Sequence, residues 1–254
     1  MKGRRRFAHV RCFSRMENLL GDRSVERLCG VKIAIFGIGG IGSYVVEALA
    51  RCGVGSLTLV DHADISQTDI NRQLYALQST VGRKKVQVAK EHIRDIDENI
   101  LVHTYETCYS SDTAGMFDLK AYDYIVDAMD SVKSKIILIE RAKASGIPVI
   151  SCLATENKLN PARLEIADIS RVSNDPVAKT MRMELRKKNI RKIKVLYSRE
   201  RNLKEKKTGK IRREGAELPA RRNGSISFVQ GAAGMLVSGE VIRDLLCEKT
   251  KSKR

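Results

Sequence analysis

Tryptophan is absent from this chain of 254 residues, and aromatic residues make up only 5% of it. Proteins that bind single-stranded nucleic acids stack bases on aromatic side chains, so that mode of binding is disfavoured. None of the six cysteines forms a Cys-x-x-Cys pair, so a four-cysteine zinc site is not supported. No apolar run approaches the roughly 18 residues of a membrane span, and the basic N-terminus lacks the apolar core of a signal peptide. We therefore expect a cytoplasmic protein with reduced cysteines.

The charge of the chain is strongly unbalanced. It has 47 Lys and Arg but 30 Asp and Glu, a formal net charge of +17, which favours polyanionic partners or anionic surfaces. Residues 179–222 hold 18 Lys and Arg against five Glu. Such a block is most often a solvated face, and binding of a phosphate backbone is the alternative. The candidate contacts in this block are Lys187, Lys188, Arg191 and Lys192.

A glycine-rich run follows the first apolar segment. Residues 31–36 are apolar, the run GIGGIGS follows, and a segment with helical spacing then ends at Gly53. A strand, a turn and a helix in this order bring backbone N–H groups and the positive end of a helix dipole to one point, which favours a phosphate. The glycines concerned are Gly37, Gly39, Gly40 and Gly42. Their GxGxxG spacing also fits an ordinary packing turn, so the pattern alone is weak.

The residues after the glycines strengthen the nucleotide interpretation. Asp61 ends an apolar strand about 20 residues further on, where an acid suits a ribose hydroxyl. A polar and basic stretch then favours a triphosphate over a dinucleotide, because Arg offers a planar fork to phosphate oxygens and Lys offers a compact charge. Its members are Asp64, Asn71, Arg72, Gln73 and Lys85. The alternative is a solvated loop and a charged helix face.

A second apolar strand, expected near residues 123–127, also ends in acids. Asp127 and Asp130 lie at its carboxyl end, where open α/β sheets bind ligands. A carboxylate there can hold a magnesium ion that bridges phosphate oxygens. For Asp130 the alternative is an N-cap of the helix that begins near Ser131.

The alternation of strands and helices predicts a Rossmann-like, doubly wound α/β fold, with a mostly parallel sheet, helices on both faces and a smaller basic C-terminal extension. Strands are expected near 31–36, 56–60, 100–105, 123–127 and 147–152, and helices near 24–28, 42–52, 82–96, 132–145, 177–192 and 232–246. Residues 193–230 are expected to add further strands together with the basic loop, and the alternation in Ser225–Phe228 predicts a half-buried strand there. We expect a single domain over 1–254, with a nucleotide-binding half at 30–152 and a half for substrate binding and dimerisation at 153–254, including a basic loop at 199–223.

These motifs resemble the ThiF family of the ubiquitin-activating-enzyme superfamily. The resemblance implies an enzyme that binds ATP and magnesium and lets a substrate carboxylate attack the α-phosphate. It implies that the glycine turn and Asp61 hold the nucleotide, with Asp64, Asn71, Arg72, Gln73 and Lys85 close to it and Asp130 on the magnesium ion. Arg15 is similar to an arginine that a neighbouring subunit offers to the triphosphate, which implies a homodimer. The residues given catalytic roles are Arg15, Arg72, Lys85 and Asp130.

Longer segments resemble the branch of tRNA threonylcarbamoyladenosine dehydratases. These include FSRMENLLG near the start, residues 167–190, and GSISFVQGAAGMLVSGEVI near the end. The branch implies ATP-dependent cyclisation of the threonylcarbamoyl group at tRNA position 37, with tRNA as the partner of the basic residues. It leaves open a monovalent cation and a cysteine desulfurase or sulfur-acceptor partner. One departure is Leu153–Glu156, which replaces a glycine-rich segment and would narrow the space for the substrate.

Two other functions remain compatible with the sequence. One is an adenylating enzyme that activates the C-terminus of a ubiquitin-like or sulfur-carrier protein, with Cys152 as the candidate receiving thiol. The other is a non-catalytic module that binds nucleotides and RNA.

Overall fold

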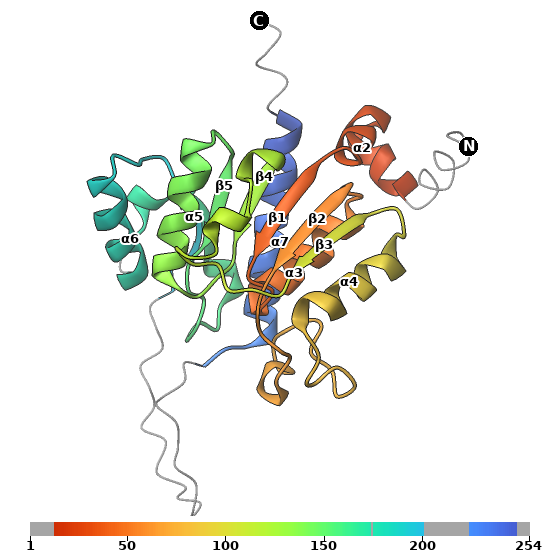
Figure 1. The fold of residues 1–254 in the computed structure, drawn as a ribbon, viewed down its shortest axis with the longest axis horizontal. Coiled ribbons are helices and arrows are strands. Elements are labelled where there is room, and N and C mark those ends of the chain that lie inside the picture. Colours follow the sequence, from red (N-terminus) through yellow and green to blue (C-terminus); the bar gives the residue numbers. More distant parts are fainter. Residues whose placement is uncertain (1–12, 174, 201–223, 248–254) are drawn as a thin grey trace, which may run out of the picture.

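A seven-stranded sheet forms the centre of the chain, with the strand order β3-β2-β1-β4-β5-β7-β6 (Figure 1). It is seen in a computed structural model that describes residues 13–173, 175–200 and 224–247. The strands are β1 (Lys32–Phe36), β2 (Ser56–Val60), β3 (Leu101–Tyr105), β4 (Tyr124–Asp127), β5 (Val149–Cys152), β6 (Leu164–Asp168) and β7 (Lys194–Ser198). All neighbouring strands are parallel except β6 and β7. The predicted Rossmann-like α/β fold with a mostly parallel sheet is confirmed.

Helices pack on both faces of this sheet. They are α2 (Asp22–Leu28), α3 (Gly40–Arg51), α4 (Lys85–Ile96), α5 (Val132–Ala144), α6 (Pro176–Lys187) and α7 (Ser227–Cys247). Helices α3, α4 and α7 share a hydrophobic core with one face, and α5 and α6 share a second core with the other. In Figure 1, α7 runs behind the centre of the sheet. No helix in the described ranges has the length and apolarity that a membrane span requires.

The apolar strands explain why the sheet is covered twice. Along β1, Ile33 and Ile35 enter the core under α3 and α7, whereas Ala34 and Phe36 enter the core under α5. Successive side chains of a strand point to opposite faces, so a run that is apolar throughout fits only a sheet that is buried on both sides.

Two elements differ from the sequence expectation. Strand β6 was not anticipated. The strand expected over Ser225–Phe228 is wrong, because α7 begins at Ser227 and Phe228 lies on this helix, 47% exposed. Four alternating residues cannot distinguish strand from helix, and the small residues that follow let α7 pack closely on α3. A Cβ added at Gly234 would lie 2.6 Å from the Cβ of Tyr44.

Candidate active site

A cavity of about 560 Å³ opens at the carboxyl ends of the central strands. Its wall includes residues that directly follow β1, β2, β4 and β5. Strand β1 lies between β2 and β4, so the crossovers leave it in opposite directions, and open α/β sheets bind their ligands at such a point. The volume suits a small-molecule site.

The turn between β1 and α3 forms one wall. Gly37 has a φ of +92°, and a Cβ there would lie 2.5 Å from the carbonyl oxygen of Ala128. A Cβ at Gly42 would lie 1.9 Å from the carbonyl oxygen of Gly37, so these two glycines serve the packing of the chain itself. At Gly39, which lines the cavity, a Cβ would meet nothing within 4 Å. The turn therefore leaves space beside Gly39, at the N-terminus of α3, where no described side chain caps the N–H groups.

Asp61 connects the end of β2 to this turn. Its Oδ2 accepts a hydrogen bond from the backbone N–H of Ile38 at 2.7 Å, and its Oδ1 accepts one from the N–H of Ala63 at 2.8 Å. Each carboxylate oxygen retains a second lone pair, and Asp61 lines the cavity. Asp61 can therefore accept a hydrogen bond from a hydroxyl group of a ligand while it holds the glycine turn in place.

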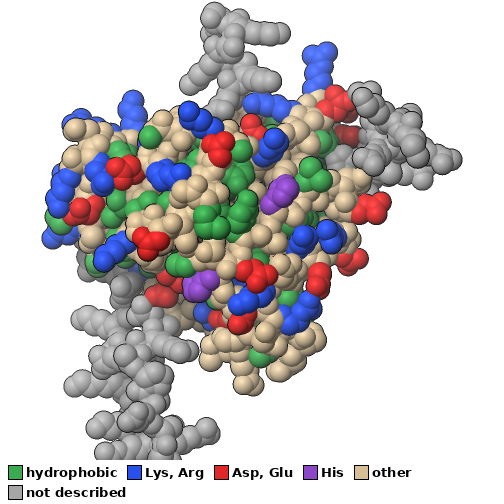
Figure 2. All heavy atoms as spheres, viewed as in Figure 1, with side chains coloured by type: hydrophobic (Ala, Val, Ile, Leu, Met, Phe, Trp, Pro, Cys, Tyr) green, Lys and Arg blue, Asp and Glu red, His purple; other side chains and the backbone are tan. Residues whose placement is uncertain are grey.

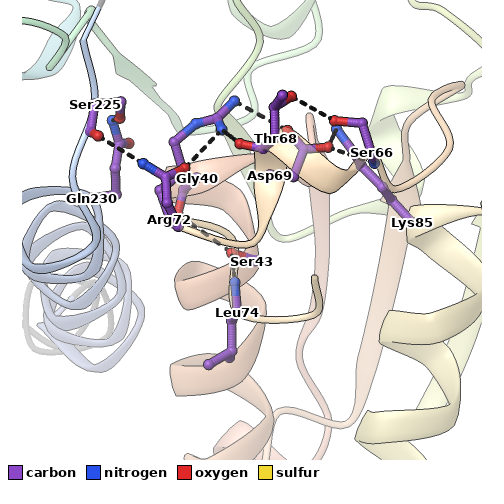
Figure 3. A network of polar contacts seen from close by, with 11 residues as sticks. Gly40, Ser43, Ser66, Thr68, Asp69, Arg72, Leu74, Lys85, Ser225 and Gln230 are labelled. Carbon is purple, nitrogen blue, oxygen red and sulfur yellow. Dashed lines mark hydrogen bonds and ion pairs between the residues drawn. The ribbon is translucent and has the colours of Figure 1, made fainter. Parts of the chain in front are cut away.

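Two cations reach the cavity from the crossover between β2 and α4 (Figure 3). The guanidinium of Arg72 donates to the carbonyl oxygen of Thr68 at 2.7 Å and lies 3.1 Å from Oδ1 of Asp69. Nζ of Lys85 lies 3.8 Å from Oδ2 of Asp69. One buried carboxylate thus holds both cations at the cavity wall.

Asp69 is a site residue that the sequence analysis missed. Burial opposes its ionisation, but hydrogen bonds from Ser66 and the charges of Lys85 and Arg72 outweigh burial and lower the pKa of the carboxyl group. The available signal was the Ser-x-x-Asp spacing, because Ser66 and Asp69 form a capping box.

Asp130 is exposed at the cavity wall, after the end of β4. It is not the N-cap of α5, because that position is held by Ser131, whose Oγ accepts the N–H of Ser134 at 3.3 Å. Magnesium is often bound through one or two carboxylates together with substrate phosphates, so an exposed Asp130 fits such an ion. Within the described ranges, no three His, Cys, Asp or Glu residues converge into a metal cluster.

A buried ion pair lies at the β4–β5 end of the cavity, and the sequence analysis did not anticipate it. Nζ of Lys135 donates to Oδ1 of Asp127 at 3.1 Å and to the carbonyl oxygen of Cys152 at 2.8 Å. Oγ of Ser151 donates to Oδ2 of Asp127 at 2.5 Å. Burial raises the pKa of the Cys152 thiol to about 12, so this cysteine is protonated at neutral pH and is a poor nucleophile.

The remaining predicted nucleotide ligands are divided between the cavity and its surroundings. Gly40 and Gln73 line the cavity. Asp64 does not line it and pairs with Lys84 at 2.8 Å. Asn71 does not line it either and donates to the carbonyl oxygen of Ser225 at 3.0 Å.

Arg15 is exposed on the helical run at residues 13–20 and does not line the cavity. Phe13 packs beside Gly53, where an added Cβ would lie 3.2 Å from the phenyl ring. Gly53 follows α3 at its far end, about 20 Å along the helix from the glycine turn. Arg15 is therefore remote from the cavity of its own chain.

The four basic candidates from the sequence lie toward the amino ends of the parallel strands, whereas the cavity lies at their carboxyl ends. They are Lys187, Lys188, Arg191 and Lys192, and all are exposed. Helix α6 starts at the cavity with Val177 and rises about 15 Å to its end at Lys187. Lys188, Arg191 and Lys192 follow α6 and come before the amino end of β7. The cavity lies at the carboxyl ends of the parallel strands.

Acidic side chains partly neutralise this basic group. Lys187 pairs with Glu184 at 2.7 Å, and Lys188 pairs with Glu140 at 2.8 Å. Figure 2 shows Lys and Arg interspersed with Asp and Glu over the α6 side of the molecule. Most of the expected basic loop, residues 201–223, lies outside the described residues.

The chain belongs to the ThiF family, because the model of that family matches residues 13–253. Its fold and its cavity agree with a nucleotide-binding member of the superfamily.

Similar proteins carry a more specific name. The tRNA threonylcarbamoyladenosine dehydratase of Bacillus subtilis is 39% identical over 242 residues, which cover 92% of this chain and 94% of the relative. The enzyme of the same name from Haemophilus influenzae is 39% identical over 69% of this chain and 67% of its own length. A crystal structure of the Escherichia coli tRNA N6-threonylcarbamoyladenosine dehydratase in complex with AMP superposes with a TM-score of 0.86 at 25% identity, covering 96% of this chain and 97% of the other. The same enzyme in complex with ATP gives a TM-score of 0.85.

Proposed function

We propose that this chain is an ATP-dependent tRNA threonylcarbamoyladenosine dehydratase. The carboxylate of the threonylcarbamoyl group on the adenosine at tRNA position 37 attacks the α-phosphate of ATP, and pyrophosphate leaves. A nucleophile within the carbamoyl group then attacks the acyl carbon of the adenylate and closes a ring, and AMP leaves with the former carboxylate oxygen. The modified adenosine loses one water in total, and ATP is converted to AMP and pyrophosphate.

The observation that carries this proposal is the collection of phosphate-binding features in one cavity. The space beside Gly39 receives the phosphates, Asp61 holds the ribose, and Arg72 and Lys85 neutralise the leaving pyrophosphate. Both steps depend on positioning and on compensation of charge, so no cysteine nucleophile is needed. The high pKa of Cys152 agrees with this route.

Magnesium would be held by Asp130, the exposed carboxylate of the cavity wall. When bound, the ion supplies positive charge to the phosphate oxygens. Asp130 is the residue of this chain that positions that charge at the end of β4.

The proposal that residues 153–254 bind the substrate is supported by how the described residues on either side of the basic segment are attached. Glu200 and Gly224 flank residues 201–223, and both bind the loop that follows β5. A carboxylate oxygen of Glu200 accepts the N–H of Asn160 at 2.8 Å, and the N–H of Gly224 donates to Oδ1 of Asn157 at 2.8 Å. The two described residues that flank this segment are therefore attached to the same loop that supplies Leu153–Glu156 to the cavity wall, and we expect the tRNA carrying the reacting base to approach there.

We further propose a cytoplasmic homodimer. Arg15 is remote from its own cavity and would complete the site of a partner chain. Helix α7 exposes Phe228, Met235 and Leu236, an apolar set that a second copy would cover. Cys52, Cys108 and Cys152 are free thiols, as is common in cytoplasmic proteins.

The test is release of AMP and pyrophosphate from ATP and magnesium with three additions: tRNA bearing threonylcarbamoyladenosine, the same tRNA without the modification, and a small sulfur-carrier protein. The proposal expects AMP only with the modified tRNA, and mass spectrometry of its nucleosides should show the loss of water. AMP release that requires the carrier protein would favour the other adenylating activity. ATP and tRNA binding without AMP formation would favour a non-catalytic module.

A further inference from the structure

Lys135 combines nearly complete burial with access to the cavity. Its side chain is 3% exposed and that of Asp127 is fully buried. Lys135 lines the cavity, whereas Asp127 does not. Lys135 therefore forms part of the cavity wall, while its counter-ion Asp127 lies behind that wall.

The ammonium group has one donor left over. An ammonium carries three N–H groups, and here Asp127 and the carbonyl oxygen of Cys152 accept two of them, at 3.1 and 2.8 Å. The described part of the chain offers Nζ no third acceptor. A buried donor without an acceptor is unfavourable, so this position favours a ligand with an oxygen acceptor.

The protein holds this donor in a fixed position. Asp127 accepts hydrogen bonds from Ser151 at 2.5 Å and from the backbone N–H of Met129 at 3.1 Å, in addition to the one from Lys135. A movement of the Asp127 carboxylate together with Lys135 would break the hydrogen bonds from Ser151 and Met129. Because Asp127 also balances the charge of Lys135, the cavity wall does not contain an isolated buried cation.

The place of Lys135 in the strand order determines which part of a ligand it can reach. In the proposed function Asp61, at the end of β2, binds the nucleoside, and the glycine turn after β1 binds the phosphates. Lys135 lies on the other side of β1, between the ends of β4 and β5 and next to Leu153–Glu156. An acid that attacks the α-phosphate in line with the leaving pyrophosphate approaches from the side opposite Arg72 and Lys85, which the proposed function assigns to the pyrophosphate, and so arrives at this end of the cavity.

We propose that Lys135 forms an acyl subsite, in which its third N–H binds the non-attacking oxygen of the substrate carboxylate and then the acyl carbonyl oxygen of the adenylate. The identity of the acid rests on the proposed function. The subsite itself needs only a carboxylate ligand and a nucleotide. A hydrogen bond between an ammonium and a carboxylate is charge-assisted, which gives both orientation and affinity.

Two nucleotide probes test the subsite without turnover and without tRNA. One is 5′-O-sulfamoyladenosine, and the other is its N-acetyl derivative, which carries an acyl carbonyl where the adenylate would have it. Because removal of Lys135 alone would leave a buried charge on Asp127, the variant is the double substitution Asp127→Asn with Lys135→Met. The control is Lys133→Met, which makes the same lysine substitution at an exposed position of the same helix.

In the wild type we expect the acetyl probe to bind more tightly than the plain probe. The double variant should lose about tenfold in affinity for the acetyl probe, the loss expected for one charge-assisted hydrogen bond, and keep its affinity for the plain probe. The control should change neither affinity. An equal loss for both probes, or an unchanged preference, would overturn the subsite.

A measurement on the unmodified protein guards against a double variant that does not fold. An N-ethyl probe has no carbonyl oxygen, so the wild type should bind it less tightly than the acetyl probe. Equal binding of these two probes would refute the role of Lys135. The failure of the proposed function would appear elsewhere, as absence of AMP release with modified tRNA.

Discussion

Substitution of Gly39 by alanine separates ligand binding from folding at the glycine turn. Gly39 has a negative φ of −91°, and a Cβ added there meets nothing within 4 Å. The free energy of unfolding should therefore change by no more than about 0.5 kcal/mol. A phosphate seated beside Gly39 would contact the new methyl group, and overpacking of this kind costs about 1–3 kcal/mol. The dissociation constant for ATP should rise roughly 5- to 150-fold.

Urea unfolding and calorimetric titration with ATP and magnesium measure the two quantities separately. Gly42→Ala is the matched comparison, because its Cβ would lie 1.9 Å from the carbonyl oxygen of Gly37 and should lower stability before any ligand is added. If Gly39→Ala bound ATP as tightly as the wild type, the phosphates would not lie on this turn. The assignment of the cavity would then have to be abandoned.

Three further predictions concern residues around the cavity and the edge of the sheet. Asp69→Asn should weaken ATP binding, because the two cations of the crossover lose the carboxylate that holds them. The pKa of Asp69 is lowered, so its contribution to the free energy of unfolding is complete above the unfolded pKa and is lost as the pH falls through the folded pKa. The variant should therefore lose less stability between neutral and acidic pH than the wild type. An equal loss of stability in urea unfolding would contradict this. Burial opposes protonation of Lys194, but hydrogen bonds to carboxylates on α7 outweigh burial and raise the pKa of this lysine. The contribution of Lys194 to the free energy of unfolding is therefore present at neutral pH and is lost only as the pH rises through its folded pKa. Lys194→Met should cost about 1–2 kcal/mol at neutral pH in thermal unfolding, less than a fully buried pair because solvent screens it, and no shift there would argue against the pair. Neutralising Lys187 and Lys188 together should reduce the salt dependence of tRNA affinity by about one unit of slope per lost phosphate contact, and leave AMP formation at saturating tRNA intact; a salt dependence equal to that of the wild type would place the tRNA elsewhere.

The local sequence predicted the elements that form the proposed phosphate site. Strand β1 and the glycines after it could be read directly, because a doubly buried strand is apolar throughout and a turn that packs this closely tolerates only glycine. Asp130 was predicted from its place at a strand end. These signals are local, since each arises from residues adjacent in the chain.

The parts that escaped prediction depend on contacts between distant segments. Lys135 is polar on a helix and gives no sign that it reaches Asp127 and β5 in the interior. Asn71 stands beside Arg72, yet it turns to the backbone before α7, 154 residues further along the chain. Residues 227 and 228 lie in a helix and not in the expected strand, because glycines further along α7 pack against α3. A window of four residues includes neither these glycines nor α3.

The strand order also explains how one cavity can hold two reacting groups in line. Strand β1 leads into the proposed phosphate-binding turn, β2 on one side leads to Asp61, the proposed acid for the nucleoside, and β4 and β5 on the other side lead to Asp130 and the contacts of Lys135. In this arrangement we expect a nucleotide across β1 to present its α-phosphate toward β4, and the substrate acid to arrive from the side where the chain provides a buried ammonium donor. The crossovers leave β1 in opposite directions, so the proposed nucleoside side at β2 and the proposed acid side at β4 and β5 lie on opposite sides of β1. Substitutions on the β2 side should accordingly affect nucleotide affinity, whereas those between β4 and β5 should affect the acid. Titrations with the plain and acylated probes would detect this division, and a variant at Asp61 that discriminated between the two probes would contradict it.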